Sequence, residues 1–540
     1  MPASLLTGGS LTQLKNRWGF VIQDPHDRGF VAMQKALTIF FILIAGILYS
    51  PDVKADDGKG LSLLNTPDGI IRGQAGRDMY MKHCASCHHA ERYGLRAPAL
   101  IPETLKPYKK EELAGIIKDG LPATQMPSFK KVLTDQDVEK LVSYITIPIE
   151  NVHWTDEDIQ NSREIAVKKE SPAVLSGIDR ENITLIVESG KSVTVMDGSN
   201  FESLDKFSVG AIHGGPKFSH ALRYIYAPTR DGVITKYDID TLQKIGSIKV
   251  GVNMRNIALS EDDKLLAAAN YLPNNMIVLD SDFNLIKRID VTGKIGGIYA
   301  LHNKKEFVCS FRDAAELWFI DYNKGFAIEK IALPEPFEDI SISPFEDIII
   351  GASRKGTKIY VYSFKDKKII GSFDTEGMPH LASATYWIEK GALYTAVNHL
   401  KRPVLTILDL NNLKVVKEIT LEGSGFFVRT HQATPYIWVD TNTDKIQLVD
   451  KATQKVAKTL IPSDGKKAMH IEFTKDGRYA LVSIYEEEGA LVIYDAFNLN
   501  EIKRLPFKKP AGKYNALNKT YPGRMLKEQM VLQRAAHKLN

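Results

Sequence analysis

Two cysteines and a histidine stand close together in the first quarter of the chain. They form Cys84-Ala85-Ser86-Cys87-His88, the attachment pattern of a c-type haem. Two thiols can add to the two vinyl groups of one haem, and the two intervening residues let both thiols reach the same porphyrin edge. The next histidine then lies under the iron. We therefore predict that Cys84 and Cys87 hold a haem and that His88 binds its iron.

A redox-active or zinc-binding CxxC is the competing interpretation. A redox CxxC belongs to a βαβ context, which is absent here, and a zinc site needs a second Cys/His pair at suitable spacing. A sixth iron ligand is expected about forty residues further on, where Met126 precedes Pro127. Met126 could instead fill a core, but a Met-Pro loop between two predicted helices is a poor core position. Helical patterns flank the motif, so residues 56–147 are predicted to form a small all-α class I cytochrome c domain.

A second group of candidate residues lies in the C-terminal two thirds of the chain. Four members occupy equivalent segments before the first strand of a repeat: His213, Arg255, His380 and His470. His431 falls a few residues later, towards the far end of its strand. Imidazoles that converge on one opening can bind a haem or a metal and act as acids and bases, although a single histidine is more often structural. Gly214-Gly215 favours a ligand role for His213, since a planar group needs close approach of the backbone.

The repeat that positions these residues consists of short β-rich runs, most of which end in aspartate. Its markers are spaced 41 to 46 residues apart: Asp197, Asp238, Asp280, Asp321, Ser363, Asp409, Asp450 and Asp495. Eight units of this length are typical of four-stranded propeller blades. The sequence therefore predicts an all-β eight-bladed propeller over residues 182–520, with a β-solenoid or a sandwich as the alternative.

Composition and charge exclude several classes of protein. The 540 residues are 44% hydrophobic and 25% charged, an ordinary globular composition. The 70 Lys+Arg against 65 Asp+Glu give a formal net charge of +5, which does not imply a nucleic-acid partner. Three cysteines provide no disulfide framework.

The N-terminal region has the pattern of an export signal. Residues 36–49 are apolar but too short to span a bilayer comfortably, and small residues precede a cleavage position after Ala55. We expect a signal region over 1–55 with its start at Met33, a periplasmic mature chain and no stable membrane span in it; an uncleaved anchor is the alternative. Residues 148–181 are expected to form a linker or a wrapped arm, and residues 521–540 a C-terminal tail, solvated or in contact with another part or partner.

A cytochrome c domain followed by an eight-bladed propeller resembles the cytochrome cd1 family of denitrifying bacteria. The resemblance covers about residues 73–520 and is carried by AIHGGPKFSHALRYIYAPTRDGVITKYD, GVNMRNIALS, MPH, FVRTHQATPYIWVD and GKYNALNKT. It implies that the propeller holds haem d1 without a covalent bond, with His213 as the proximal ligand. His380 and His431 match the two distal-face histidines of the nitrite reductases, and Arg255 is expected at the same mouth.

Two branches of this family share the domain order. One reduces nitrite to nitric oxide, and the other, the dihydro-haem d1 dehydrogenases, oxidises a propionate of the precursor to acrylate. HGGPKFS and Tyr514, where the reductases typically carry phenylalanine, favour the dehydrogenase branch, in which His470 and Tyr514 resemble an acid/base pair. The resemblance then implies a nitrite reductase as haem d1 recipient and a periplasmic c-type cytochrome as electron acceptor. A nitrite reductase and a non-catalytic haem d1 carrier remain as alternatives.

Overall fold

The computed structural model describes residues 67–94, 97–105, 108–120, 126–149, 152–166, 177–189 and 192–528. The expected signal region, with Met33 and Ala55, lies outside these residues. Within the described ranges, no helix is long and apolar enough to cross a membrane. Helices dominate up to residue 161 and strands dominate after residue 182.

The N-terminal helices form a small domain. They are α2 (Pro67–His83), α3 (Ala85–His88), α4 (Pro102–Leu105), α5 (Lys110–Asp119) and α6 (Asp135–Ile145). Tyr80, Leu113 and Leu141 are buried together in one apolar cluster. Helix α6 begins at a capping box, in which Thr134 Oγ1 accepts the amide of Asp137 at 3.2 Å and the Asp137 carboxylate accepts the amide of Thr134 at 3.1 Å. The predicted small all-α domain is confirmed.

The described part of the segment after this domain packs as an arm along the second sheet of the propeller. It contains α7 (Asp156–Asn161) and β1 (Glu164–Ile165). Strand β1 pairs antiparallel with the outer strand β8, and Trp154 Nε1 donates to the carbonyl of Lys249 at 3.1 Å. The arm therefore covers the open edge of one blade, where an unpaired strand would otherwise be exposed.

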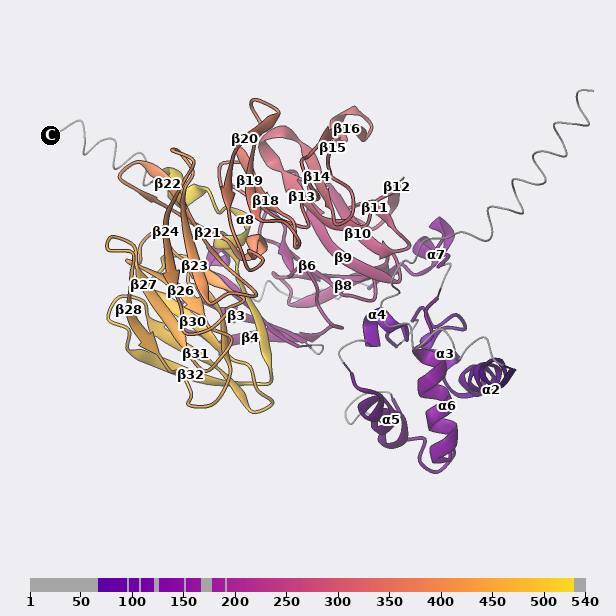
Figure 1. The fold of residues 1–540 in the computed structure, drawn as a ribbon. Helices are drawn as coiled ribbons and strands as arrows, with labels where there is room; N and C mark the ends of the chain where they lie inside the picture. The colour runs from indigo at the N-terminus through magenta and orange to yellow at the C-terminus, as the bar shows by residue number, and fades with distance from the viewer. Residues whose placement is uncertain are drawn as a thin grey trace, which may run out of the picture. The chain divides into compact units, whose positions relative to one another are not determined.

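Eight antiparallel sheets follow, each with four propeller strands (Figure 1). The strands of the first four sheets are β2 (Ile183–Glu188), β3 (Ser192–Asp197), β4 (Ser203–Ser208); β5 (Lys217–Phe218), β6 (Tyr224–Pro228), β7 (Val233–Asp238), β8 (Gln243–Lys249); β9 (Asn253–Leu259), β10 (Leu265–Leu272), β11 (Asn275–Asp280), β12 (Leu285–Asp290); β13 (Ile295–Leu301), β14 (Glu306–Phe311), β15 (Glu316–Asp321), β16 (Ala327–Ala332). The remaining strands are β17 (Asp339–Ile342), β18 (Ile348–Ala352), β19 (Lys358–Ser363), β20 (Lys368–Asp374); β21 (Thr385–Glu389), β22 (Ala392–Asn398), β23 (Val404–Asp409), β24 (Lys414–Thr420); β25 (Val428–Thr430), β26 (Tyr436–Asp440), β27 (Ile446–Asp450), β28 (Lys455–Leu460); β29 (Ala468–Phe473), β30 (Tyr479–Ile484), β31 (Gly489–Asp495), β32 (Glu501–Phe507) and β33 (Pro510–Asn515).

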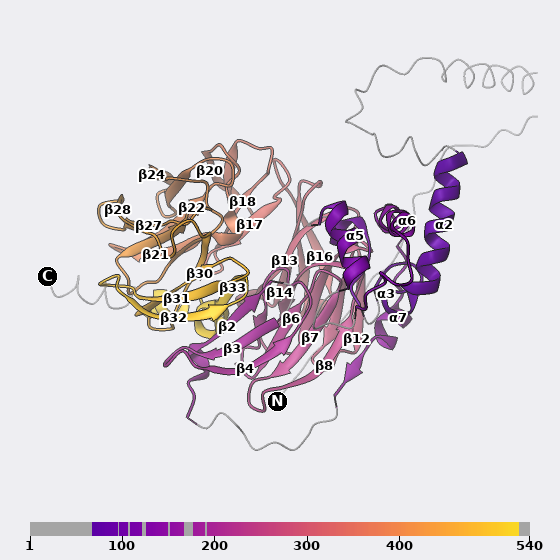
Figure 2. The same ribbon diagram turned by 90° about the horizontal axis from the view of Figure 1, so that it is seen from below.

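The last strand of the chain closes the ring. Strand β33 pairs with β2 and becomes the innermost strand of the first sheet, so that this sheet combines both ends of the propeller sequence. Figure 2 shows yellow β33 and β31 beside purple β2 and β3. The predicted eight-bladed propeller is confirmed, and all eight blades present their innermost strands to one axial channel.

The repeat of aspartates that identified the blades has a local cause. Each marker ends the third strand of its blade, and its side chain accepts backbone amides of the following turn in blade after blade. Asp197 Oδ1 accepts the amide of Ser199 at 2.8 Å, and Asp409 Oδ1 accepts that of Asn411 at 3.0 Å. Ser363 makes the equivalent bond with its hydroxyl. The aspartates therefore fix the turn between the third and fourth strands.

The described part of the C-terminal tail is packed against the propeller. The tail follows α8 (Ala516–Thr520), Tyr521 donates to the carbonyl of His220 at 2.6 Å, and Leu526 is buried in an apolar cluster with Ile350. A solvated tail is therefore wrong for residues 521–526.

Candidate active site

Cys84 joins α2 to α3, and the other four residues of the CxxCH segment form α3. The carbonyl of Cys84 accepts the amides of Cys87 at 3.1 Å and of His88 at 2.9 Å. Both thiols are unpaired, Cys84 partly buried and Cys87 exposed. The turn thus brings two thiols and one imidazole together, as covalent haem attachment requires.

The His88 ring is prepared for metal binding. It is 8% exposed, and its Nδ1 lies 2.7 Å from the carbonyl of Pro98. A carbonyl can only accept, so Nδ1 carries the proton and Nε2 keeps its lone pair for iron. Burial lowers the pKa of His88, which keeps the ring neutral. The role of Pro98 could not be predicted from the sequence, because Pro98 lies ten residues from its partner.

Met126 follows residues 121–125, which lie outside the described ranges. Its backbone packs on Gly120, where an added Cβ would lie 2.7 Å from the carbonyl oxygen of Met126. Gly120 has a φ of +72°, so it satisfies both the turn and the close contact. The iron-ligand role of Met126 stays a prediction.

The second group of candidates gathers where the inner strands of the propeller begin. His213 and His380 lie in loops before β5 and β21. Arg255 and His470 lie inside β9 and β29, and not in loops as predicted. Because the blades of these four residues each start at their innermost strand, all four belong to the same end of the channel.

His213 has the hydrogen bonding of a metal-binding imidazole. Its Nδ1 lies 2.5 Å from the carbonyl of Arg255, which leaves Nε2 unprotonated. Burial, followed by the charges of Arg255 and Arg230, lowers the pKa of His213 to about 3. The ring is therefore neutral at physiological pH, and the residues present fit a metallated tetrapyrrole bound axially through Nε2.

Packing inside the protein explains the Gly214-Gly215 pair after His213, whereas the prediction relied on the close approach of a planar ligand. Both residues have positive φ, 75° and 74°. A Cβ on Gly214 would lie 2.4 Å from Cβ of Asn256, and one on Gly215 would lie 2.5 Å from the ring of Tyr514. The glycines therefore let the His213 loop pack against Asn256 and Tyr514.

Arginines surround the His213 end of the channel. The charges of Arg230, Arg255 and Arg312 all act on the His213 ring. Arg255 Nε donates to the carbonyl of Gly296 at 2.7 Å, which fixes part of its guanidinium. A cluster of cations suits a ligand with several carboxylates. Sequence reasoning found Arg255 but missed Arg230 and Arg312.

His470 and Tyr514 lie side by side although they belong to the last and the first blade. Their ring centroids are 5.7 Å apart, and the ring of Phe427 lies 4.5 Å from that of His470. Burial, then the charges of Lys513 and Lys519, hold the pKa of His470 well below its usual value. Burial raises the pKa of Tyr514 to about 12. A neutral imidazole and a protonated phenol therefore share one desolvated site, as acid/base chemistry needs.

The backbone of His470 has a strained conformation, and hydrogen bonds hold both its amide and its carbonyl. Its φ is +50°, at a bulge between Met469 and Ile471. The amide of His470 donates to Asp440 Oδ2 at 3.2 Å, and the ammonium of the fully buried Lys513 donates to the carbonyl of His470. Strain of this kind persists where surrounding contacts enforce it and is common at functional sites.

His380 reaches the same cluster through the segment before β25. Its Nδ1 lies 2.6 Å from the carbonyl of Phe426, and its ring centroid is 6.1 Å from that of Phe427. The partly buried Asp339 lies near His380, and burial raises the pKa of its carboxyl. His380 is therefore placed near His470, with Phe427 between them.

The structure does not bring His431 to this group. His431 follows the C-terminal end of β25, and both of its ring nitrogens are occupied: Nδ1 accepts the amide of Ala433 at 3.1 Å and Nε2 donates to the carbonyl of Lys475 at 3.2 Å. A Cβ on Gly477 would lie 1.9 Å from His431 Nδ1. The ring is thus enclosed between two blades, and it holds two loops together.

Replacing His431 by asparagine is expected to lower the free energy of unfolding by about 1–3 kcal/mol at pH 7, because two buried backbone groups lose a partner. Burial lowers the pKa of folded His431 to about 4, against a usual 6.5. Its stabilising contribution is therefore complete above pH 6.5 and is lost as the pH falls towards 4. Denaturant titrations from pH 7 to pH 4 should show the difference from wild type shrinking. The exposed His153→Asn serves as the control and should show no difference at either pH.

Besides Arg230 and Arg312, three more functional candidates were not predicted from the sequence: Arg429, Asp440 and Lys513. Arg429 and Lys513 lie within the inner strands β25 and β33, and Asp440 ends β26. Charged residues inside strands that border a channel are themselves a signal, visible in VRT and GKYN. Their orientation depends on register and could not be deduced.

Two family models match the chain. That of the cytochrome D1 heme domain matches residues 178–519, and that of the cbb3-type cytochrome c oxidase subunit III matches residues 72–145. The second model covers the CxxCH segment, in agreement with a covalently bound haem.

Several characterised proteins are similar over most of the chain. A dihydro-heme d1 dehydrogenase of Pseudomonas aeruginosa is 39% identical over 464 residues, which cover 82% of this chain and 94% of the relative. Protein NirF of the same organism is 27% identical over 61% of this chain and 89% of its own length. A nitrite reductase of Stutzerimonas stutzeri is 22% identical over 82% of this chain and 92% of its own length.

Among solved structures, that of the dihydro-heme d1 dehydrogenase NirN in complex with DHE superimposes with a TM-score of 0.78 at 38% identity. It covers 83% of this chain and all of the solved chain.

Proposed function

The chain belongs to the cytochrome D1 heme domain family, and from that membership we propose that it oxidises a propionate side chain of dihydro-haem d1 to acrylate. The reaction removes two protons and two electrons from the two methylene carbons. The observation that carries the proposal is the buried pair of His470 and Tyr514, 5.7 Å apart, beside a histidine with an available Nε2. The 39% identity with a dihydro-heme d1 dehydrogenase supports the same reaction.

Each residue of the site has its own role in the proposed reaction. His213 holds the tetrapyrrole through Nε2, and the neighbouring arginines match its carboxylates. The neutral His470 takes up one of the two protons, which displaces the hydrogen bond that its Nδ1 accepts from the amide of Lys513 at 3.3 Å, and the second proton leaves to solvent. Tyr514 keeps its own proton and can donate a hydrogen bond. Haem c, held by Cys84, Cys87 and His88, would accept electrons one at a time when bound.

The proposal also covers the location of the protein, its electron acceptor and the recipient of its product. The signal pattern before Ala55 supports a periplasmic mature chain. A c-type cytochrome would then take the electrons from haem c, and a nitrite reductase would receive the finished haem d1. The 22% identity with a nitrite reductase keeps nitrite reduction as the second candidate, since His380 suits both reactions.

One experiment separates these functions. Purified protein with haem c attached is loaded with dihydro-haem d1, an electron acceptor is added, and the absorption spectrum and the mass of the extracted tetrapyrrole are followed. We expect the product to be lighter by two hydrogen atoms. Unchanged mass combined with nitric oxide formation from nitrite would establish the reductase instead, and unchanged mass without any turnover would indicate a carrier.

The pH dependence of this conversion follows from the protonation states of His470 and Tyr514. Burial keeps the pKa of His470 far below 6.5 and raises that of Tyr514 to about 12. Both groups therefore hold their protonation states, and the single-turnover rate should be flat between about pH 6 and 9. A steep rise in rate between pH 6 and 7.5 would show that another group is the base.

A further inference from the structure

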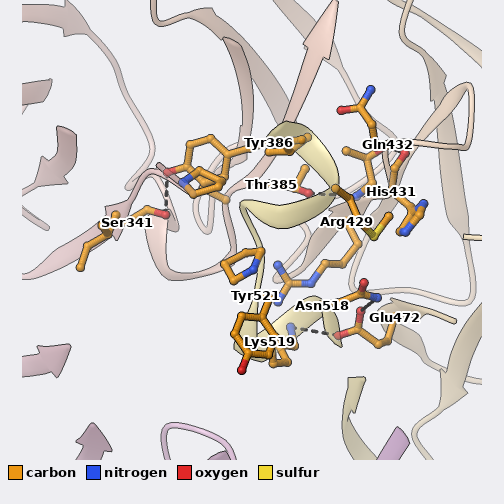
Figure 3. Close-up of a pocket in the computed structure, with 17 residues that line it drawn as sticks. Ser341, Thr385, Tyr386, Arg429, His431, Gln432, Glu472, Asn518, Lys519 and Tyr521 are labelled. Carbon is orange, nitrogen blue, oxygen red and sulfur yellow. Dashed lines mark hydrogen bonds and ion pairs between the residues drawn. The ribbon is translucent and has the colours of Figure 1, made fainter. Parts of the chain in front are cut away.

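Arg429 is a cation that forms no ion pair among the described residues. It lies on the inner strand β25 and is partly buried. Across the described ranges, its guanidinium has neither a hydrogen bond nor an ion pair, and Figure 3 shows it reaching into the cavity with no partner marked. An arginine carries five donors, so a partly desolvated one without partners favours an anionic ligand.

The nearest carboxylate is already occupied. Glu472 is 2% exposed, its Oε2 lies 2.9 Å from Lys519 Nζ, and its Oε1 accepts from Asn518 Nδ2 at 3.3 Å. Burial by itself would raise the pKa of Glu472, but the charges of Lys519 and Arg429 lower it. Glu472 therefore forms its ion pair with Lys519, and Arg429 is left without one.

Arg429 lies beside the proposed acid/base pair. Its charge acts on the rings of both His470 and Tyr514. It follows Phe427 by two residues, and the ring of Phe427 lies 4.5 Å from that of His470. Phe427 lies just before β25, so Arg429 follows directly on the segment that contacts His470.

A cavity lies next to Arg429. Its volume is about 270 Å³, and Tyr386, His431, Lys519 and Tyr521 are among the residues that line it with Arg429. Pockets for whole ligands are commonly about 300–1,000 Å³. A macrocycle at the His213 end could therefore extend one acidic side chain towards this cavity while its ring stays near His213.

We propose that Arg429 binds the carboxylate of the reacting propionate and so places its two methylene carbons beside His470 and Tyr514. This rests on the proposed function. A planar guanidinium can bind both carboxylate oxygens at once, which fixes the direction of the side chain as well as its position. Arg429 is in this sense a positioning residue for the propionate, and it takes no part in the proton or electron transfers.

The test compares Arg429→Ala, Arg429→Lys and wild type, all with haem c attached. The dissociation constant of dihydro-haem d1 is measured by absorbance titration, and its conversion by single turnover. For Arg429→Ala we expect about tenfold weaker binding and about thirtyfold slower conversion, the loss of one charge-assisted bidentate contact. Millimolar guanidinium should restore part of both, and Arg429→Lys should lie between wild type and the alanine variant. The exposed Arg478→Met is the matched control, for which binding and conversion should equal wild type.

Two results would overturn the proposal: unchanged binding and conversion in Arg429→Ala, or a loss that neither guanidinium nor lysine repairs, which would mark a structural role. The binding measurement also separates this proposal from the proposed function. If wild type binds dihydro-haem d1 without oxidising it, the proposed reaction fails, whereas the effect of Arg429 on affinity is still measured.

Discussion

Replacing His470 by asparagine is expected to slow the oxidation of dihydro-haem d1 by about 10²–10⁴-fold, the usual contribution of a general base. Asparagine is the informative substitute because the backbone at this position has a φ of +50°, a conformation that asparagine adopts more readily than most residues. The bonds from the amide of residue 470 to Asp440 and from Lys513 to its carbonyl can then persist. The variant loses the imidazole and keeps the fold.

The measurement is single-turnover conversion together with the dissociation constant of dihydro-haem d1. Binding should stay within about threefold of wild type, since the His213 end is untouched. The exposed His153→Asn is the control, a histidine outside the propeller site, and it should leave the rate unchanged. Conversion at the wild-type rate in His470→Asn would remove His470 from the mechanism.

Replacing Lys513 by methionine is expected to lower the free energy of unfolding by about 1–3 kcal/mol and to slow conversion by about 10²-fold. Lys513 is fully buried and donates to the carbonyl of His470 and to the hydroxyl of Ser483. Methionine fills a similar volume but leaves both oxygens without their donor. The strained backbone of His470 can then relax, which displaces its ring from Tyr514.

The variant Lys451→Met separates the loss of stability from the loss of conversion rate. Lys451 is also a buried lysine, and its Nζ donates to the carbonyls of His431 at 2.8 Å and Thr434 at 2.6 Å, in a loop away from His470. Denaturant titration should show a similar loss of stability in both variants, whereas only Lys513→Met should lose rate. Equal rates in the two variants would show that Lys513 is only a structural residue.

The features that could be predicted from the sequence are those with local causes. The haem-attachment segment is a single turn of contiguous residues, and the propeller was visible because each blade fixes one turn with an aspartate such as Asp409. His213, Arg255, His380 and His470 could be placed approximately, because the repeat gives each a position along its blade, whereas Tyr514 was assigned from the family resemblance.

The features that escaped prediction depend on strand ends and bulges. His431 lies two residues after Arg429, which would put both on one side of a continuous strand, but β25 ends at Thr430 and His431 turns away. The bulge at His470 and its bond to Lys513 join residues 43 positions apart. No pattern along the chain encodes that contact, since it exists only when the last blade meets the first.

Closure of the ring by β33 has a consequence for how the protein is made. Tyr514 is carried on the strand that is synthesised last, and it meets His470 only when β33 docks onto β2. The pair of His470 and Tyr514 is therefore assembled by the same event that completes folding. A nascent, truncated or partly unfolded chain lacks the pair, so an incompletely folded molecule cannot carry out the chemistry on a reactive tetrapyrrole.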